Sequence, residues 1–139
     1  MNSISEINWL AIPVAGIITM FVGGLWYGPL FGKAWMQEFG ITEEEIKASG
    51  SPAPAMIKSF IASLVLGIGM SLIIIWSGMP AGDWAGGAVV GGLTAVLVVG
   101  GAVFPNYAFE SKTIKHYLIH MGNITVSMIL IGAMLAVWR

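Results

Sequence analysis

Cysteine is absent from this chain, and charged side chains are scarce. None of the 139 residues is a cysteine, which excludes disulfides, thiolate chemistry and cysteine-ligated metal sites. Charged residues make up 9% of the chain, whereas an average soluble domain has about 25%. A water-soluble fold of this composition would expose large apolar patches and aggregate. The scarcity of charge therefore excludes an ordinary soluble domain.

Several functional signatures are missing as well. No run of basic residues suggests binding to nucleic acid. The N-terminus lacks the positive segment and the small-residue cleavage site of a signal peptide, so we expect the first apolar run to be retained. No nucleophile–base pair, phosphate-cradling glycine loop or carboxylate pair is recognisable. We therefore expect a protein without catalytic residues, cofactor or metal.

Four long stretches without any charged side chain dominate the sequence. They cover residues 7–32, 59–82, 84–109 and 116–138. A bilayer core is about 30 Å thick, and a helix needs roughly 20 apolar residues to cross it. The sequence thus predicts an all-α, integral membrane four-helix bundle, which fills residues 1–139 as a single domain. We expect the spans near 7–29, 58–79, 84–105 and 116–138, with a loop at 30–57.

The placement of lysines predicts the orientation of the spans. The first and third loops hold Lys33, Lys47, Lys58, Lys112 and Lys115. The opposite side has only Arg139 and the terminal amine. Because cytoplasmic loops carry the excess of positive residues, we expect loops 1 and 3 in the cytoplasm and both termini outside.

The long first loop carries two helix signals. Phe31, Trp35 and Phe39 recur at four-residue spacing and share one helical face, which is typical of a helix lying on the membrane surface. Thr42 followed by Glu45 is a capping-box pattern and predicts a second short helix. We expect a short interfacial or cytoplasmic helical loop, which serves either as a surface tether or as a gate or partner-docking segment.

Small residues recur at helical spacing in every span. Helices in lipid associate through close packing of such residues, since burying apolar side chains gains little there. The predicted helix-packing positions include Gly23, Gly67, Gly87, Gly91 and Gly132. Packing within one four-helix bundle is the simplest interpretation, and a glycine-lined pore is an alternative. The third span has small residues on more than one face, so we also expect it to contact a second subunit in a homo-oligomer.

The strongest polar groups gather toward the predicted cytoplasmic ends of the spans. This candidate cluster comprises Tyr27, Asn106, Glu110, His116, His120 and Asn123. Ionisable residues inside a membrane are costly and often functional, and His116 and His120 share a helix face. Three interpretations stay open. The groups satisfy neighbouring side chains at the headgroup level, or they bind a small polar ligand or relay protons, or the histidines and Glu110 bind a metal.

Several segments together resemble a known family. They are residues 8–12, 24–36, 42–45, 106–110 and 131–139, which include the elements Trp26-Tyr27-Gly28-Pro29 and Asn106-Tyr107-Ala108-Phe109-Glu110. These segments are similar to the opening, the acidic loop, the N-Y-x-F-E element and the ending of domain of unknown function 1761 (DUF1761), a family of small bacterial membrane proteins. The resemblance implies a four-span protein of the bacterial inner membrane and brings no established activity. It also suggests that Tyr27, Asn106 and Glu110 form one polar contact set.

The sequence favours a non-catalytic, self-associating membrane module whose partners are the lipid bilayer and further copies of the chain. A small transporter or channel, with coupling to protons as one form of it, is the first alternative. A membrane-embedded enzyme is the second. The identity of any small-molecule ligand is unknown at this point.

Overall fold

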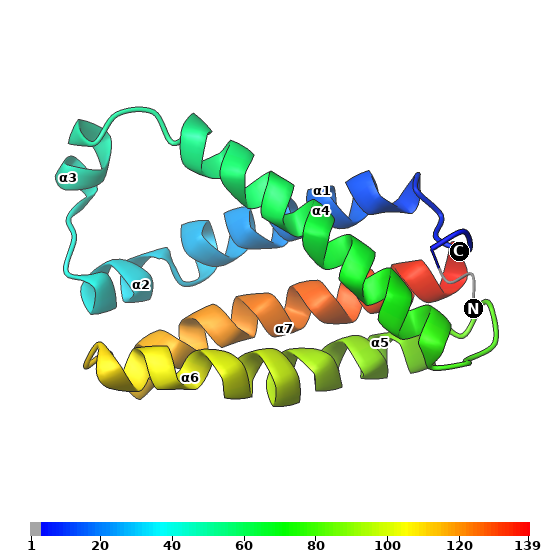
Figure 1. The fold of residues 1–139 in the computed structure, drawn as a ribbon. Helices are drawn as coiled ribbons and strands as arrows, with labels where there is room; N and C mark the ends of the chain where they lie inside the picture. The colour runs from blue at the N-terminus through cyan, green and yellow to red at the C-terminus, as the bar shows by residue number, and fades with distance from the viewer. Residues whose placement is uncertain (1–3) are drawn as a thin grey trace.

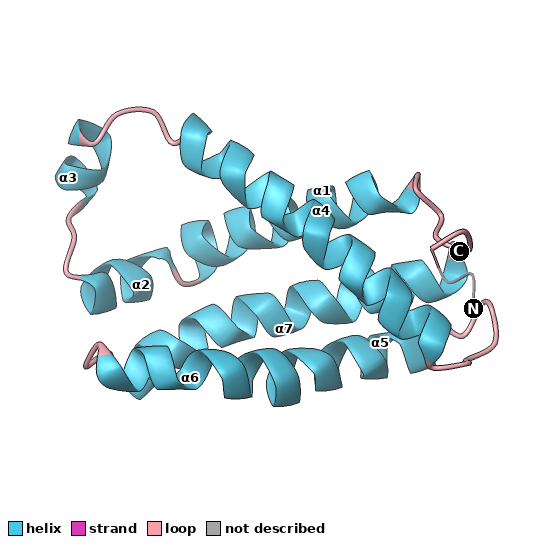
Figure 2. Cartoon of the chain, viewed as in Figure 1, coloured by secondary structure: helices cyan, strands magenta, loops and turns pink. Residues whose placement is uncertain are grey.

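Helices joined by short turns make up the computed structural model, which describes residues 4–139 (Figure 1, Figure 2). No strand occurs within these described residues. Four helical segments are long and apolar enough to cross a bilayer: Ala11–Leu30, Ala53–Trp76, Trp84–Phe109 and Ile114–Val137. The prediction of an all-α membrane bundle is confirmed. The helix of the second span begins at Ala53, earlier than the start near residue 58 that the sequence suggested.

The first span combines helix α1 (Ala11–Leu25) with a π-helical segment, η1 (Trp26–Leu30). Pro13 lies in the first turn of α1, where a backbone N–H would have no partner within the helix, so the proline is tolerated there. Pro29 lies inside η1, and Phe31 follows as its C-cap. The wider turns of a π-helix are rare in proteins, and many of those that occur lie at functional sites. The first span therefore changes its helical register at its end.

The loop after the first span folds into two short helices, α2 (Gly32–Phe39) and α3 (Glu43–Ala48). Gly40 ends α2 at φ 74°, a left-handed conformation that glycine adopts without steric cost. The Thr42 hydroxyl accepts a hydrogen bond from the Glu45 backbone N–H at 3.2 Å, and the Glu45 carboxylate accepts one from the Thr42 N–H at 2.8 Å. The predicted capping box is thus confirmed.

The other three spans are straight runs of helix with one interruption. The second is α4 (Ala53–Trp76), and the fourth is α7 (Ile114–Val137). The third consists of α5 (Trp84–Leu93), a second π segment, η2 (Thr94–Val99), and α6 (Gly100–Phe109). Asp83 caps α5 through the Gly86 N–H at 2.9 Å, and Thr113 caps α7 through the His116 N–H at 3.0 Å.

The third span runs antiparallel to α7, α1 lies along α7, and α4 crosses both α1 and α7 (Figure 1). One end of the bundle carries α2, α3 and the turn from α6 to α7, and we refer to it as the loop end. The other end carries both chain termini and the turn from α4 to α5, and we refer to it as the terminal end. α7 contacts each of the other three spans, so it is the central helix of the fold.

Glycines allow α5 and α7 to approach each other closely. Gly87 lies against Gly132 and Ala136, and Gly91 lies against the backbone of Met128. A Cβ at Gly87, Gly91 or Gly132 would overlap backbone atoms of the facing helix. Dispersion contacts between the two backbones replace the hydrophobic driving force that lipid does not provide. This contact fixes α5 on α7.

The remaining predicted packing glycines differ in their surroundings. Gly67 of α4 faces Ala15 of α1, where a Cβ would come within 3.0 Å of the Ala15 methyl. Gly23 has open space around it, with nothing within 4 Å of the position that a Cβ would take. In the third span only Gly101 has an equally open face. The glycine faces that motivated a second subunit on this span are therefore mostly occupied inside the chain, and the homo-oligomer stays a prediction.

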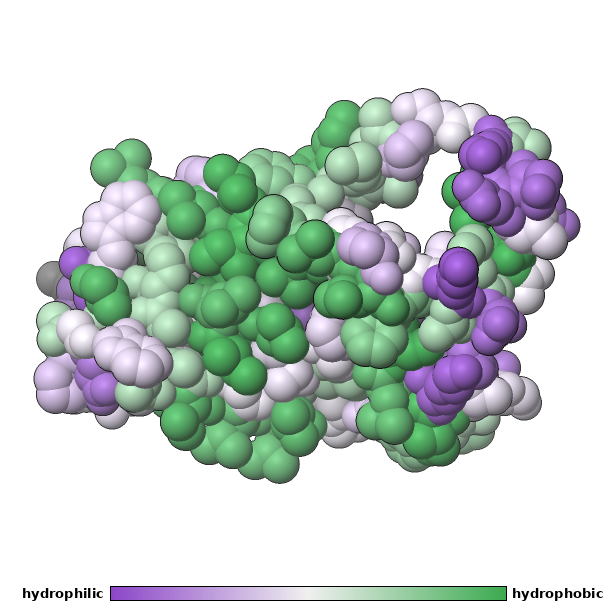
Figure 3. Space-filling view, turned by 180° about the vertical axis from the view of Figure 1, so that it is seen from behind, coloured by the Kyte–Doolittle hydropathy of each residue, from purple (hydrophilic) through white to green (hydrophobic). Residues whose placement is uncertain are grey.

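The outer surface of the bundle is strongly apolar. Figure 3 shows hydrophobic residues over the middle of the molecule and hydrophilic residues concentrated at the loop end. Large side chains such as Phe21, Val65 and Leu97 are more than 60% exposed within the chain. In water this surface would aggregate, whereas in a bilayer it faces acyl chains. The exposed apolar surface is thus the lipid-facing surface of a membrane protein.

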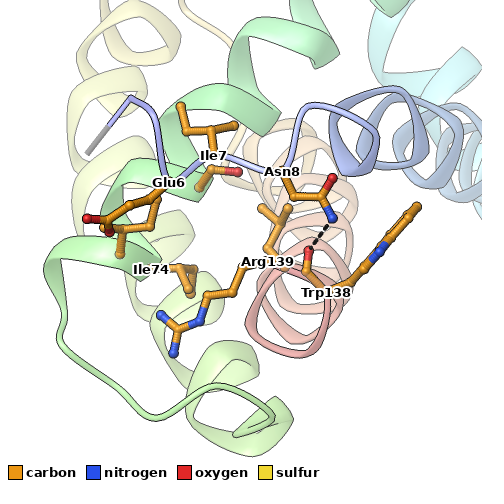
Figure 4. A pocket seen from close by; sticks show the side chains of 9 residues that line it. Glu6, Ile7, Asn8, Ile74, Trp138 and Arg139 are labelled. Atoms are coloured by element: carbon orange, nitrogen blue, oxygen red, sulfur yellow. Dashed lines mark hydrogen bonds between the residues drawn. The ribbon is translucent and has the colours of Figure 1, made fainter. Parts of the chain in front are cut away.

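At the terminal end, the N-terminal segment packs against α4 and the last turn of α7. The Asn8 amide donates a hydrogen bond to the Trp138 carbonyl at 3.4 Å (Figure 4). Ile7 is buried beside Ile74, and the Arg139 guanidinium donates to the Met79 carbonyl. These contacts leave only a narrow pocket between the chain termini and α4 (Figure 4).

Candidate functional site

A stripe of polar side chains runs along one face of α7 from the loop end toward the middle of the bundle. It comprises His116, His120, Asn123 and Ser127. The spacings of four, three and four residues place all of them on the same face of a helix. His116 and Ser127 are buried, and His120 and Asn123 are partly buried. Buried polar groups on a central membrane helix require hydrogen-bond partners, so this face of α7 is the candidate site.

The two histidines contact each other directly. The Nε2 atoms of His116 and His120 lie 3.2 Å apart, which is hydrogen-bonding distance. One ring must donate and the other accept, so the two rings are in different protonation or tautomeric states. The rings are tilted at 44° with their centroids 4.9 Å apart. His116 is only 4% exposed, so protein and not lipid surrounds its ring.

Tyrosine rings enclose the histidine pair. The Tyr107 ring of α6 meets both imidazoles edge-on, with centroids 5.6 Å from His116 and 5.9 Å from His120. The Tyr27 ring of η1 also meets His120 edge-on, with the ring centroids 5.5 Å apart. Tyr117 contacts Tyr107 at 5.4 Å and donates a hydrogen bond to the Gly100 carbonyl at 3.0 Å. All three tyrosines and both histidines of the chain thus meet in one cluster.

Tryptophans fix the position of Tyr27 in this cluster. The Trp26 indole N–H donates to the Ile119 carbonyl of α7 at 2.7 Å, which binds the end of the first span to α7. Trp35 of α2 packs edge-on against Tyr27 with centroids 5.9 Å apart. The side chain of Asn123 lies close enough to Tyr27 for the two polar groups to interact. The first span, the loop and α7 therefore meet at Tyr27.

An acidic residue of the loop holds α2 on the first turn of α7. The Thr113 hydroxyl donates to the Glu38 carboxylate at 2.5 Å. Lys115 lies 3.9 Å from the other oxygen of the same carboxylate. Thr113 also accepts a hydrogen bond from the His116 backbone N–H. Glu38, Thr113 and His116 therefore connect the loop helix directly to the helix turn that carries the first histidine.

Asn106 and Glu110 lie at the edge of this arrangement. The Asn106 side chain is exposed and makes no hydrogen bond to any described residue. Glu110 is bonded to Lys112 at 2.5 Å, and the Lys112 ammonium lies 5.1 Å from the centre of the Tyr107 ring. That bond to Glu110 raises the pKa of Lys112. The structure thus brings Tyr27, His116, His120 and Asn123 together, and places Tyr107, not Asn106, beside them.

The sequence matches the family described as Protein of unknown function (DUF1761) over residues 10–136. The chain belongs to the DUF1761 family. No curated protein matches the sequence, and no solved structure does. The part that matches DUF1761 includes every residue of the cluster around the histidine pair and nearly all of the four spans. Family membership thus places this site within the DUF1761 region and assigns no activity to it.

The arrangement has few of the features that a metal site needs. Among residues 4–139, no three side chains of histidine, cysteine, aspartate or glutamate lie close enough together to hold one ion. Glu110, the third ligand that the sequence suggested, is engaged with Lys112. The chemistry present in this DUF1761 chain is that of two imidazoles, three phenols and one amide, which exchange protons and hydrogen bonds.

Sequence reasoning did not identify Ser127, Thr113 or Glu38. Ser127 continues the spacing of the polar stripe, and that spacing alone would have found it. The contact between Glu38 and Thr113 joins residues 75 positions apart in the sequence, and a local sequence pattern cannot predict such a pair.

Proposed function

We propose that this protein is a non-catalytic, pH-responsive module of the bacterial inner membrane. Its histidine pair takes up protons from the cytoplasm, where we place the loop end, and the second added proton changes how the loop helix α2 is held on α7. The observation that carries the proposal is the 3.2 Å contact between the Nε2 atoms of His116 and His120 inside the tyrosine cluster. Histidine is the side chain whose ordinary titration falls between pH 5 and 8.

The geometry of the pair makes it sensitive to the number of protons it holds. In the neutral pair, one Nε2–H donates to the Nε2 lone pair of the other ring. A first added proton occupies the free Nδ1 of a ring and leaves this hydrogen bond intact. A second would place an N–H on both facing Nε2 atoms, so the bond is lost and two positive charges repel across 3.2 Å. The rings must then separate.

The charged and titratable groups around the pair leave this response uncompensated. Tyr27 faces it from η1 and Tyr107 from α6, Tyr117 of α7 packs behind Tyr107, and Lys112 adds a positive charge at the turn. The carboxylates of α2 and of the turn between α6 and α7 are already engaged, Glu38 with Thr113 and Lys115 and Glu110 with Lys112. A doubly protonated pair therefore has no adjacent carboxylate, among the described residues, to neutralise it.

The route from the histidines to the loop is short. The His116 N–H is capped by Thr113, and the Thr113 hydroxyl also binds Glu38 of α2. Tyr27, which touches His120, packs against Trp35 of the same loop helix. Separation of the imidazoles displaces these neighbours and loosens α2. The predicted gate or partner-docking role of the loop fits this arrangement better than a passive tether.

The transporter alternative requires a continuous polar path across the bundle. The polar stripe of α7 ends at Ser127, and buried apolar side chains follow it toward the terminal end: Met70, Ile74, Met128, Ile131 and Leu135. This apolar layer favours a module that binds protons from one side over one that conducts them. An enzyme finds no support in the cluster, because no nucleophile is paired with a base there.

Nuclear magnetic resonance on nitrogen-15 histidine in lipid nanodiscs tests the proposal. The chain has two histidines, so the variants His116→Gln and His120→Gln assign both rings. We expect coupled titration in the parent protein, with loss of the shared hydrogen bond at the second step. Each single variant then titrates in one step. Two rings that titrate independently in the parent protein would disprove the pair.

A liposome assay separates the module from the transporter. We expect vesicles that contain the protein to hold an imposed pH gradient as long as vesicles that contain the His120→Gln variant. Faster collapse of the gradient with the parent protein, abolished by His120→Gln, would establish the transporter alternative.

A further inference from the structure

Two buried oxygens in the middle of the bundle have no hydrogen-bond partner among the described residues. They are Oδ1 of Asn123 and Oγ of Ser127. Ser127 is 2% exposed, so neither lipid nor bulk solvent reaches it from outside. An unpaired polar atom in such surroundings costs about 1–3 kcal/mol, and for that reason buried polar atoms are nearly always paired. The two residues are four apart on the same face of α7.

Ser127 differs in this respect from three other hydroxyls in the spans. Thr19, Ser63 and Thr94 each donate to the backbone carbonyl four residues earlier, at 3.0, 2.8 and 2.7 Å. That local bond is the ordinary way to satisfy a hydroxyl in a membrane helix. The Ser127 hydroxyl does not make this local bond, although the backbone carbonyl of Asn123 lies four residues earlier in the helix. Its oxygen is left available to a partner that is not part of the helix.

The neighbouring residues show where the polar stripe of α7 begins and where it ends. From His116 to Ser127 the stripe covers about 16 Å of α7, roughly half the thickness of the bilayer core. The Tyr27 ring contacts His120, and Tyr27 also lies near Asn123, which carries one of the two unpaired oxygens. Beyond Ser127, Met128 and Ile131 are at most 1% exposed and belong to the apolar core. The stripe thus begins at the loop end and stops at an apolar layer.

We propose that Asn123 and Ser127 bind water at the blind end of a narrow polar path that opens only at the loop end. A water molecule that donates one hydrogen to Asn123 Oδ1 and one to Ser127 Oγ satisfies both atoms at once. A metal cation is a poorer occupant, because two neutral oxygens fall well short of the roughly six to eight that Ca²⁺ takes. The path is closed toward the terminal end by the apolar layer and by the contacts of Asn8 and Ile7 (Figure 4).

This inference rests on the unpaired oxygens and holds whether or not the histidine pair responds to pH. Water can reach Ser127 even if the histidine pair has only a structural role. Conversely, the histidine pair can respond to pH even if water reaches no farther than His120. The two proposals therefore fail separately.

The absence of native cysteine allows a direct test with single-cysteine variants. Ser127→Cys replaces a hydroxyl by a thiol of similar shape, and Ile131→Cys places a thiol one turn farther, inside the apolar layer. The probe is Ag⁺ in chloride-free buffer, because it is close to water in size and cannot cross lipid as a charged ion. It is added to the loop-end or the terminal-end face of oriented vesicles. Thiols left free are then counted with a fluorescent maleimide after denaturation.

We expect Ser127→Cys to react with Ag⁺ from the loop end and at least about ten-fold faster than Ile131→Cys, because a thiol ionises and reacts only where water reaches it. Reaction of Ser127→Cys at the slow rate of Ile131→Cys, or from the terminal end, overturns the proposal. Asn123→Cys guards against a folding defect in the first variant. If Asn123→Cys reacts from the loop end and folded Ser127→Cys does not, the path ends before Ser127 and the proposal is equally refuted.

Discussion

Gly91 of α5 lies so close to Met128 of α7 that a methyl group on Gly91 would overlap the Met128 carbonyl oxygen. The obstacle is backbone, so it has no alternative rotamer to adopt. Because α7 is also the helix that carries the polar stripe, this contact decides which face of α7 is left for α1 and the loop. The packing of two apolar helices thereby sets the position of the histidine pair.

The first prediction concerns this glycine contact. Gly91→Ala should lower the free energy of unfolding by about 1–3 kcal/mol, the usual cost of overfilling a packed interface. Gly101→Ala is the matched control, since Gly101 lies in the same span with nothing within 4 Å of its Cβ position. That control should be neutral or gain up to about 1 kcal/mol from the better helix propensity of alanine. Reversible unfolding in mixed micelles measures both, and equal effects would contradict the assigned contact.

The second prediction concerns the start of α7. Thr113→Ala removes the N-cap and the hydrogen bond to Glu38 together. We expect a loss of about 1 kcal/mol from the cap and greater mobility of α2. Thr113→Ser keeps both bonds and should behave as the parent protein does. Limited proteolysis within residues 40–52 reports the mobility, and an unchanged cleavage rate in Thr113→Ala would show that Glu38 does not hold the loop.

The third prediction concerns Lys112 in the turn outside the membrane. The hydrogen bond to Glu110 raises the pKa of Lys112 above its ordinary value of 10.5. A raised lysine pKa adds stability that is complete below the ordinary value and is lost as pH rises through the value in the folded protein. Glu110→Gln should therefore lower the pKa of Lys112, which carbon-13 methyl labelling of lysines measures.

Glu44→Gln serves as the control for this titration. Glu44 lies in α3 and makes no ion pair with any described residue. Its replacement therefore removes one negative charge from the loop without changing a contact of Lys112. An equal downward movement of the Lys112 pKa in both variants would mean that general charge, and not the contact with Glu110, sets the pKa.

The sequence by itself determined the architecture. Four uncharged runs, the capping box at Thr42 and Glu45, and the glycines at helical spacing are local signals, because each depends on residues within a few turns of one helix. The same locality placed His116 and His120 on one face of α7. The structure therefore has the four long apolar helices that the sequence predicted, and the pair of imidazoles could be expected to meet.

The tertiary structure decided which polar groups share the site. The rotation of each helix about its axis depends on neighbours far away in sequence, as with Trp26 on Ile119 and Glu38 on Thr113. The π segment η2 has more residues per turn than the helices around it, so the residues after it face other directions than in a continuous α-helix. In the resulting arrangement Tyr107 points at the histidines while Asn106 is exposed. Spacing along the chain carries no record of such a rotation, so only the packed bundle distinguishes the two residues.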